Sequence, residues 1–185
     1  MIRIEPGRIE TDHLVIRKAV LDDWPSMYEN VWRHEGTARY LFWQPTATAR
    51  EAEERMKRTL VFQQEHSWAW TVFDKATGEA IGHTGIGSTA EDGVFQEQGV
   101  VLGVKFTGKG YGREIVQALL EYTYRVLHGR RFLYSCRVDN LPSNKLAAAC
   151  GFSWLEQKDV FFEKYGRSFP ENFYGIDLPA PGMQA

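Results

Sequence analysis

Two periods of apolar residues run along the chain and separate the expected strands from the expected helices. Short apolar or alternating runs, which are typical of strands, occupy residues 14–17, 68–73, 80–87, 95–104, 132–138, 153–164 and 171–178. Apolar residues spaced by three and four, which are typical of amphipathic helices, occupy residues 22–32, 48–60, 115–127 and 140–149. The pattern predicts a single α/β domain without internal repeats, linkers or low-complexity tracts.

Capping and turn residues mark several boundaries of these elements. Thr48 and Glu51 have the spacing of a capping box at the start of the second helix. Gly129 ends the third helix and Gly151 ends the fourth. Residues 74–79, Asp-Lys-Ala-Thr-Gly-Glu, lie between two strands and predict a hairpin.

Composition and charge exclude several classes of function. The 185 residues are 43% hydrophobic and 25% charged, with a formal net charge of −2, which gives no reason to expect a nucleic-acid surface. The longest apolar runs are too short for a membrane span. The first residues lack the apolar segment of a secretion signal, so we expect a cytoplasmic protein. Cys136 and Cys150 are then expected to be reduced and unlinked. The five histidines lack metal-ligand spacing, so no metal is expected.

A glycine-rich turn before the third helix carries the strongest chemical signal. Gly108, Gly110 and Gly112 alternate there, which leaves backbone N–H groups open at the positive end of a helix dipole. Lys109 and Arg113 add positive charge, so the turn is suited to a phosphate. Neither the Ser or Thr of a P-loop nor the third glycine of a Rossmann fingerprint is present at the required spacing. A glycine-rich turn that binds no ligand is the alternative.

The sequence Gly-Lys-Gly-Tyr-Gly after a strand resembles the pyrophosphate loop of the GNAT superfamily, the acyl-CoA-dependent N-acetyltransferases. Residues 140–152, which begin Asn-x-x-Ser and end Gly-Phe, are similar to a second segment of that superfamily. Residues 97–102, Glu-Gln-Gly-Val-Val-Leu, resemble a strand of the branch that acetylates ribosomal-protein N-termini. The opening of the chain and residues 40–45 are similar to the same branch, so the resemblance covers residues 9–178.

The resemblance implies a single GNAT-like domain over residues 1–185, with a core at 9–178 and a flexible tail at 179–185. Its central sheet of about seven strands is expected to be mixed, mostly antiparallel and flanked by helices (α/β, or α+β). The strands at 95–104 and 132–138 are expected to splay apart at the acyl-CoA site. Backbone groups freed by this splay would then bind the pantetheine arm.

The resemblance also implies which residues bind acetyl-CoA, the expected cosubstrate. These residues lie on the splayed strand, in the glycine loop and at the start of the last helix: Val100, Leu102, Val104, Thr107, Gly108, Lys109, Gly110, Tyr111, Gly112, Arg113, Asn140 and Ser143. Thr107 departs from the superfamily pattern, which has Gln or Arg at that place, so one contact to the cosubstrate is missing.

Two residues are candidates for catalysis. Glu97 is the expected base, because a lone carboxylate among apolar strand residues can have a raised pKa, although an exposed strand glutamate is the alternative. The superfamily's leaving-group tyrosine is replaced by Ala147, so Ser143 is the substitute acid. Ser143 could instead cap the helix, and Asn140 could merely shape the turn before Pro142.

Tyr40, Phe42 and Trp43 lie where the resemblance places the acceptor groove, although they could equally cover the core. Trp68 and Trp70 alternate along a strand, which favours a core role. The predicted activity is acetyl transfer from acetyl-CoA to a primary amine, such as a protein or peptide N-terminus. The alternatives are a small amine as acceptor and an acyl-CoA-sensing module without turnover. A monomer and a homodimer are both compatible with the sequence.

Overall fold

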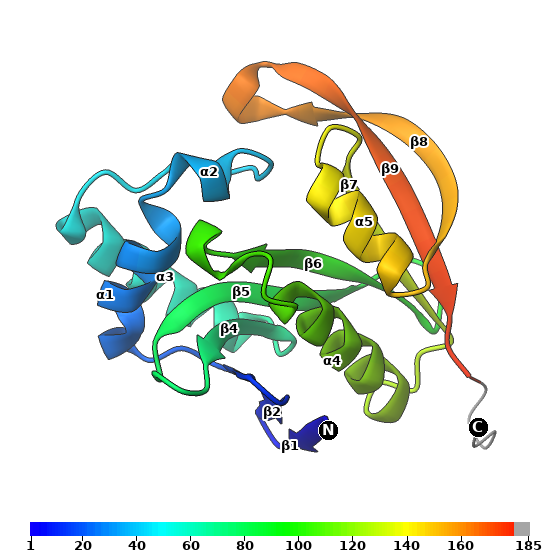
Figure 1. Ribbon diagram of the computed structural model, residues 1–185, viewed down its shortest axis with the longest axis horizontal. Helices are drawn as coiled ribbons and strands as arrows, with labels where there is room; N and C mark the ends of the chain where they lie inside the picture. The colour runs from blue at the N-terminus through cyan, green and yellow to red at the C-terminus, as the bar shows by residue number, and fades with distance from the viewer. Residues whose placement is uncertain (180–185) are drawn as a thin grey trace.

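The computed structural model describes residues 1–179, which form one nine-stranded sheet with helices on both faces (Figure 1). The strands are β1 (Arg3–Glu5), β2 (Arg8–Glu10), β3 (Leu14–Arg17), β4 (Ala69–Asp74), β5 (Ala80–Ser88), β6 (Val94–Leu102), β7 (Arg131–Arg137), β8 (Ser153–Phe162) and β9 (Arg167–Asp177). The helices are α1 (Trp24–Met27), α2 (Glu35–Ala38), α3 (Ala49–Glu65), α4 (Tyr111–Arg125) and α5 (Leu141–Ala149). Of the tail expected to be flexible, residues 180–185 lie outside the described residues.

The strand order is β1-β2-β3-β4-β5-β6-β7-β9-β8, and every neighbouring pair is antiparallel except β6 with β7. This arrangement confirms the mixed, mostly antiparallel sheet. The two strands beyond the expected seven are β1 and β2, which have three residues each. Their apolar residues Ile4 and Ile9 face each other across the pair. Such short strands give too little alternation for a sequence pattern to detect.

The two faces of the sheet carry separate hydrophobic clusters. Leu14 and Ile16 of β3 belong to the cluster under α4, whereas Val15 between them belongs to the cluster under α3. Alternate residues of a strand point to opposite faces, so α4 and α3 cover opposite sides of the sheet. Leu119 of α4 and Met56 of α3 are fully buried in their respective clusters. Within residues 1–179, no helix is long and apolar enough to cross a membrane.

The predicted boundaries are confirmed at the second helix, whereas the first helix is more irregular than expected. The N–H of Glu51 donates to Oγ1 of Thr48 at 3.2 Å, and the Glu51 carboxylate accepts from the N–H of Thr48, which completes the capping box. The first predicted helix is divided into a 3-10 turn (Leu21–Asp23), α1 and a π-helical turn (Tyr28–Trp32). The predicted hairpin joins β4 to β5.

Trp68 and Trp70 pack into the core, as their alternation favours. The Trp70 ring meets Tyr122 of α4 edge-on, with ring centroids 5.1 Å apart. The Trp68 ring meets Phe95 of β6 in the same way at 5.8 Å. Both tryptophans therefore help to hold α4 and β6 against β4, and both also border a pocket on the sheet.

The sheet opens between β6 and β7, as the sequence predicts. These parallel neighbours share only three residue pairs: Val94 with Arg131, Phe95 with Phe132, and Gln96 with Leu133. Beyond Gln96, β6 stays paired with β5 as far as Leu102, whereas β7 stays paired with β9 as far as Arg137. The two strands therefore diverge after Gln96 and leave a gap in the middle of the sheet.

Candidate active site

The gap between β6 and β7 leaves one edge of β6 without a neighbouring strand from Glu97 onward. That edge includes Val100 and Leu102, which the sequence analysis assigned to the pantetheine arm. An unpaired strand edge offers N–H and C=O groups to an extended ligand, which can then pair with it as a further strand would. The gap therefore fits the amide-bearing arm of acetyl-CoA.

Glu97 lies at the point where the gap begins, directly after the last β6–β7 pair. Its Oε2 atom accepts a hydrogen bond from the N–H of Gly99, and its Oε1 atom accepts one from the N–H of Ser135 on β7 at 3.5 Å. The carboxylate thus bridges the two strands at the apex of the splay. Its side chain is partly buried, so the alternative of an exposed strand glutamate does not describe it.

Burial raises the pKa of Glu97 to about 7. The hydrogen bonds from Gly99 and Ser135 lower this pKa, while the nearby carboxylate of Glu171 raises it further, so burial is the dominant effect. A carboxylate with a pKa near neutrality can both take up and release a proton at pH 7, which is the property that a general base requires.

Glu97→Gln is expected to stabilise the protein at pH 8 and to change its stability little at pH 5. The folded-state pKa of about 7 lies above the usual value of 4.5, so the folded protein binds the extra proton. The stability contributed by this proton is fully present below pH 4.5 and is lost as the pH rises through 7. Glutamine stays neutral and avoids that loss, which amounts to about 3 kcal/mol at pH 8. Urea unfolding at the two pH values measures the difference, and an equal effect at both would contradict a raised pKa.

Ser143 and Tyr134 form a pair of hydroxyl groups near Glu97. Their oxygens are 2.7 Å apart, and Tyr134 is buried. Burial raises the pKa of Tyr134, and the neighbouring charge of Glu97 adds to the rise, so the phenol keeps its proton. The sequence analysis missed Tyr134 because it lies on β7, whereas the superfamily's tyrosine lies on the helix at the place of Ala147.

Asn140, rather than Ser143, caps α5. Its Oδ1 atom accepts a hydrogen bond from the N–H of Ser143 at 3.4 Å. Asn144, which the sequence analysis did not single out, donates to the carbonyl of Arg137 at 3.0 Å and accepts from the hydroxyl of Tyr174 at 2.6 Å. Asn144 therefore ties α5 to β7 and β9, and this fixes the Ser143 side chain near the gap.

The glycine loop forms an open cradle at the N-terminus of α4. Gly108 and Gly110 have φ angles of 75° and 86°, and a Cβ on either residue would meet no atom within 4 Å. The N–H groups of residues 108–112 have no hydrogen-bond partner in the described chain. Open N–H groups at the start of a 15-residue helix fit the pyrophosphate of acetyl-CoA. Gly112 instead allows α4 to approach α5, since its Cβ would lie 3.2 Å from a methyl of Leu146.

The side chains around the loop are only partly available to a ligand. The Tyr111 hydroxyl donates to Asp74 at 3.2 Å, so this side chain anchors α4 and only its N–H belongs to the cradle. The Thr107 hydroxyl donates to the carbonyl of Val104 at 2.8 Å within the same turn, so it does not replace the missing Gln or Arg. Lys109 is exposed on the loop beside the cradle.

The three aromatic residues expected in the acceptor groove are divided between two places. The Tyr40 hydroxyl donates to the carbonyl of Asp139 at 3.2 Å, and the Phe42 ring stacks on Phe162 with centroids 4.4 Å apart. These two residues therefore brace the turn after β7 and the β8–β9 hairpin. Trp43 instead lines a pair of pockets on the α3 face of the sheet.

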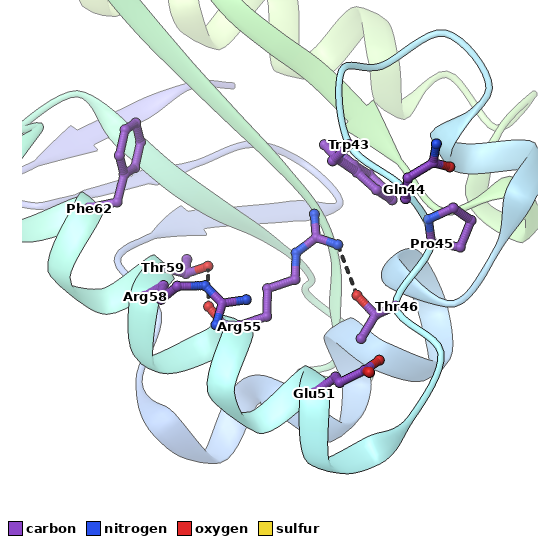
Figure 2. A pocket seen from close by; sticks show the side chains of 9 residues that line it. All are labelled: Trp43, Gln44, Pro45, Thr46, Glu51, Arg55, Arg58, Thr59 and Phe62. Atoms are coloured by element: carbon purple, nitrogen blue, oxygen red, sulfur yellow. Dashed lines mark hydrogen bonds between the residues drawn. The ribbon is translucent and has the colours of Figure 1, made fainter. Parts of the chain in front are cut away.

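The larger of these pockets, about 860 Å³, lies between α3 and β5. Gly85 and Gly87 belong to its lining, and the Gln98 side chain of β6 lies against both glycines. The pocket ends at Gln98 on β6, the strand that also carries Glu97, and it is the candidate acceptor groove although Glu97 is not part of its lining. The smaller pocket, about 520 Å³, lies between α3 and residues 43–46 (Figure 2).

His83 and Arg55 line the larger pocket, and neither was singled out from the sequence. Burial lowers the pKa of His83 to about 4, and the neighbouring charge of Arg55 acts in the same direction. His83 is therefore neutral at pH 7, whereas Arg55 supplies positive charge. Arg55 lies on α3 and His83 on β5, and the two come together only because α3 packs on the sheet. The spacing of residues in the sequence does not predict this contact.

Cys136 and Cys150 are free thiols, which confirms that they are unlinked. Burial raises the pKa of Cys136 to about 11, and burial also raises the pKa of Cys150 against the opposing charge of Arg113. Such thiols are protonated at pH 7 and are weak nucleophiles. Replacing both with alanine or serine should therefore leave kcat within a few-fold of the wild type in an acetyl-transfer assay. Loss of all turnover with CoA binding intact would contradict this prediction.

Comparison with known proteins identifies relatives over most of the chain. The family model described as acetyltransferase (GNAT) domain matches residues 13–153. A Bacillus subtilis protein described as the uncharacterized N-acetyltransferase YnaD is 26% identical over 164 residues, covering 84% of this chain and 86% of that protein. In the part of the chain that the structure describes, no group of His, Cys, Asp or Glu is arranged to hold a metal ion.

Two similar solved structures share the fold of this chain. One is an acetyl transferase from Salmonella typhimurium, described as modifying the N-terminal serine of ribosomal protein L7/L12. It has a TM-score of 0.72 and 21% identity and covers 91% of this chain and 97% of its own. The other is RimL, a ribosomal L7/L12 α-N-protein acetyltransferase in complex with coenzyme A. Its TM-score is 0.73 at 22% identity, with 91% of this chain and 96% of that chain covered.

Proposed function

The chain belongs to the GNAT acetyltransferase family, and we propose that its acceptor is the α-amine of a protein or peptide N-terminus. Acetyl-CoA is the cosubstrate and supplies the acetyl group as an activated thioester. In the proposed reaction the neutral amine attacks the thioester carbon directly. A C–N bond forms, the C–S bond breaks, the amine proton passes to Glu97, and the leaving sulfur takes a proton from a neighbouring hydroxyl.

The observation that carries this proposal is the single carboxylate of Glu97 at the apex of the splay, with a pKa of about 7. A lysine amine has a pKa of about 10.4, so its neutral form costs about 4–5 kcal/mol at pH 7. An α-amine with a pKa of about 7.8 costs only about 1 kcal/mol. A single weak base is sufficient when deprotonation of the amine costs so little free energy. The site therefore favours an α-amine over a lysine as the acceptor.

Groups around the gap are suited to the other two tasks of the reaction, which are binding acetyl-CoA and protonating the leaving sulfur. The N–H groups near Val100 and Leu102 would hold the pantetheine arm and polarise the thioester oxygen. The loop at residues 108–112 would hold the pyrophosphate. Ser143 would give the leaving sulfur its proton while the Tyr134 hydroxyl, 2.7 Å away, donates a hydrogen bond to the serine oxygen. The proton that Glu97 takes from the amine would then return to Ser143 through solvent, which restores both groups.

The acceptor class is also supported by the two structural neighbours described as modifying ribosomal protein L7/L12, one of them explicitly at its N-terminal serine. At 21% and 22% identity the similarity to these neighbours shows a shared fold and not a shared acceptor. The acceptor of this chain therefore needs its own test.

Thiol release from acetyl-CoA with a panel of amines tests the proposal. The panel contains short peptides with free N-termini, Nα-acetyl-lysine amide, a polyamine and an aminoglycoside. We expect kcat/KM to be at least about tenfold higher for the best α-amine peptides than for the other amines. Turnover with the polyamine or aminoglycoside alone would instead indicate a small-amine acetyltransferase. Tight CoA binding without thiol release from any amine would indicate an acyl-CoA-sensing module.

A further inference from the structure

Arg55 projects from α3 into the space between the two pockets, and Figure 2 shows its guanidinium group reaching toward Trp43 and Thr46. Its central guanidinium carbon lies 4.3 Å from the ring centroid of Trp43 and 4.8 Å from that of Trp32. One terminal nitrogen donates to the Thr46 hydroxyl at 2.9 Å. The guanidinium group is therefore held in place by two indole rings and one hydroxyl group.

Within residues 1–179, Arg55 makes no ion pair, and its other guanidinium nitrogens have no hydrogen-bond partner. The acidic residue that shares the smaller pocket, Glu51, accepts from the N–H groups of Ala47 and Thr48 through its Oε2 atom and forms no ion pair with Arg55 in the described chain. Glu65 lines the far end of the larger pocket and is exposed to solvent. The positive charge of Arg55 is thus not balanced by the chain.

A partly buried cation without a counter-ion is unfavourable, because it loses hydration and gains no ion pair. This environment has a measurable effect, since burial lowers the pKa of Arg55 to about 10 and the charge of Arg58 adds to the decrease. The neighbouring His83 stays uncharged and offers no compensation. An anionic ligand would remove this cost.

The larger pocket extends from Arg55 to β6, the strand that carries Glu97. It runs from Trp43 and Arg55 along β5 to Gln98, the residue after Glu97. Gly85 and Gly87 add no side chains of their own to this stretch of β5, where the Gln98 side chain lies against them. An acceptor lying along the pocket would have its amine toward Glu97 and its opposite end toward Arg55.

We propose that Arg55 binds a carboxylate of the acceptor, so that the enzyme acts on amines that carry an acidic group some distance from the amine. This inference rests on the proposed function and specifies the acceptor further. A carboxylate matches the planar, paired donors that remain free on a guanidinium group. A polyamine or an aminoglycoside, by contrast, would bring positive charge against Arg55.

The test compares pairs of acceptors that differ only in one carboxylate. The pairs are Ser-Asp-Ala-Ala-amide and Ser-Asn-Ala-Ala-amide, and Ser-Ala-Glu-Ala-amide and Ser-Ala-Gln-Ala-amide. In the wild type, kcat/KM for the acidic member of at least one pair should exceed that for its amide by about 10- to 100-fold. Arg55→Met should reduce this ratio to about one while leaving kcat/KM for the neutral member within a few-fold.

Arg58→Gln is the matched control, because Arg58 lies on the same helix and lines only the smaller pocket, outside the proposed groove. It should keep the wild-type preference. Thermal unfolding and CoA affinity verify that the Arg55→Met variant is folded. If that variant does not fold, Arg55→Lys replaces it and should lower the preference by losing the paired donors.

Equal rates on both members of every pair in the wild type, or an unchanged preference in Arg55→Met, would overturn the inference. If no amine is acetylated, the proposed function fails, and calorimetric binding of the same peptides to the CoA complex still tests Arg55. Binding that requires both the carboxylate and Arg55 would then support the inference, and binding that requires neither would overturn it.

Discussion

Glu97→Gln is expected to lower kcat about 100-fold or more at neutral pH, with little change in the affinity for acetyl-CoA. The substitution removes the base at the apex of the splay but keeps the size of the side chain. Its amide oxygen can still accept a hydrogen bond from the N–H of Gly99 or Ser135, so the gap should keep its shape. The loss is therefore expected in kcat rather than in cosubstrate binding.

The pH dependence separates loss of a base from general damage. With a pKa of about 7, Glu97 is protonated at low pH and ionised at high pH, so the wild-type rate should rise through neutrality. In Glu97→Gln the part of the rise that comes from ionisation of Glu97 should be absent. The remaining pH dependence of the rate should be that of the ionisation of the amine. The deficit should therefore shrink as the pH rises and the amine loses its proton unaided.

Glu171→Gln is a matched control, because Glu171 is a buried carboxylate whose charge raises the pKa of Glu97. Removing that charge should move the rising limb to lower pH without reducing the plateau. Wild-type kcat in Glu97→Gln from pH 6 to 9 on the true acceptor would show that the base lies elsewhere.

Gly110→Val is expected to abolish CoA binding while circular dichroism still shows the native fold. Gly110 has a φ angle of 86°, and the space where its Cβ would project is empty. A valine side chain would fill the cradle in which the N–H groups of residues 108–112 face a pyrophosphate. Gly112→Val should also abolish binding, but by a different route, because its Cβ would press on Leu146 and displace the start of α4.

Gly78→Val separates the loss of the cradle from the cost of backbone strain. Gly78 has a φ angle of 74° and equally open surroundings, but it lies in the hairpin between β4 and β5. Both variants should therefore lose similar stability, about 1–3 kcal/mol, and only Gly110→Val should lose CoA binding. Calorimetry showing wild-type affinity in Gly110→Val would exclude the loop as the pyrophosphate site.

Much of the fold was predictable because local chemistry determines it. The capping box at Thr48, the hairpin at residues 74–79 and the strand–loop–helix around Gly110 each depend on residues close together in sequence. The irregular first helix was not predictable in this way. Its π-helical turn at Tyr28–Trp32 buries Val31 and Trp32 against the sheet, so packing rather than helical spacing determines its geometry.

In the candidate site, too, only the residues that belong to a local sequence motif could be predicted. Glu97 and the glycine loop could be identified because each lies in a recognisable motif. Tyr134 and Arg55 could not, because their significance arises from neighbours distant in the chain: Ser143 on α5 in one case, and Trp32, Trp43 and β5 in the other. Such contacts depend on how α5 and α3 pack on the sheet.

The most direct test of the central claim uses one peptide that carries both a free N-terminal α-amine and a lysine side chain. The peptide is incubated with the wild-type protein and acetyl-CoA, and fragmentation mass spectrometry then locates the acetyl group. The account predicts acetylation of the α-amine in preference to the lysine, with both products greatly reduced by Glu97→Gln at neutral pH. Acetylation confined to the lysine side chain, or α-amine acetylation undiminished by Glu97→Gln, would contradict it.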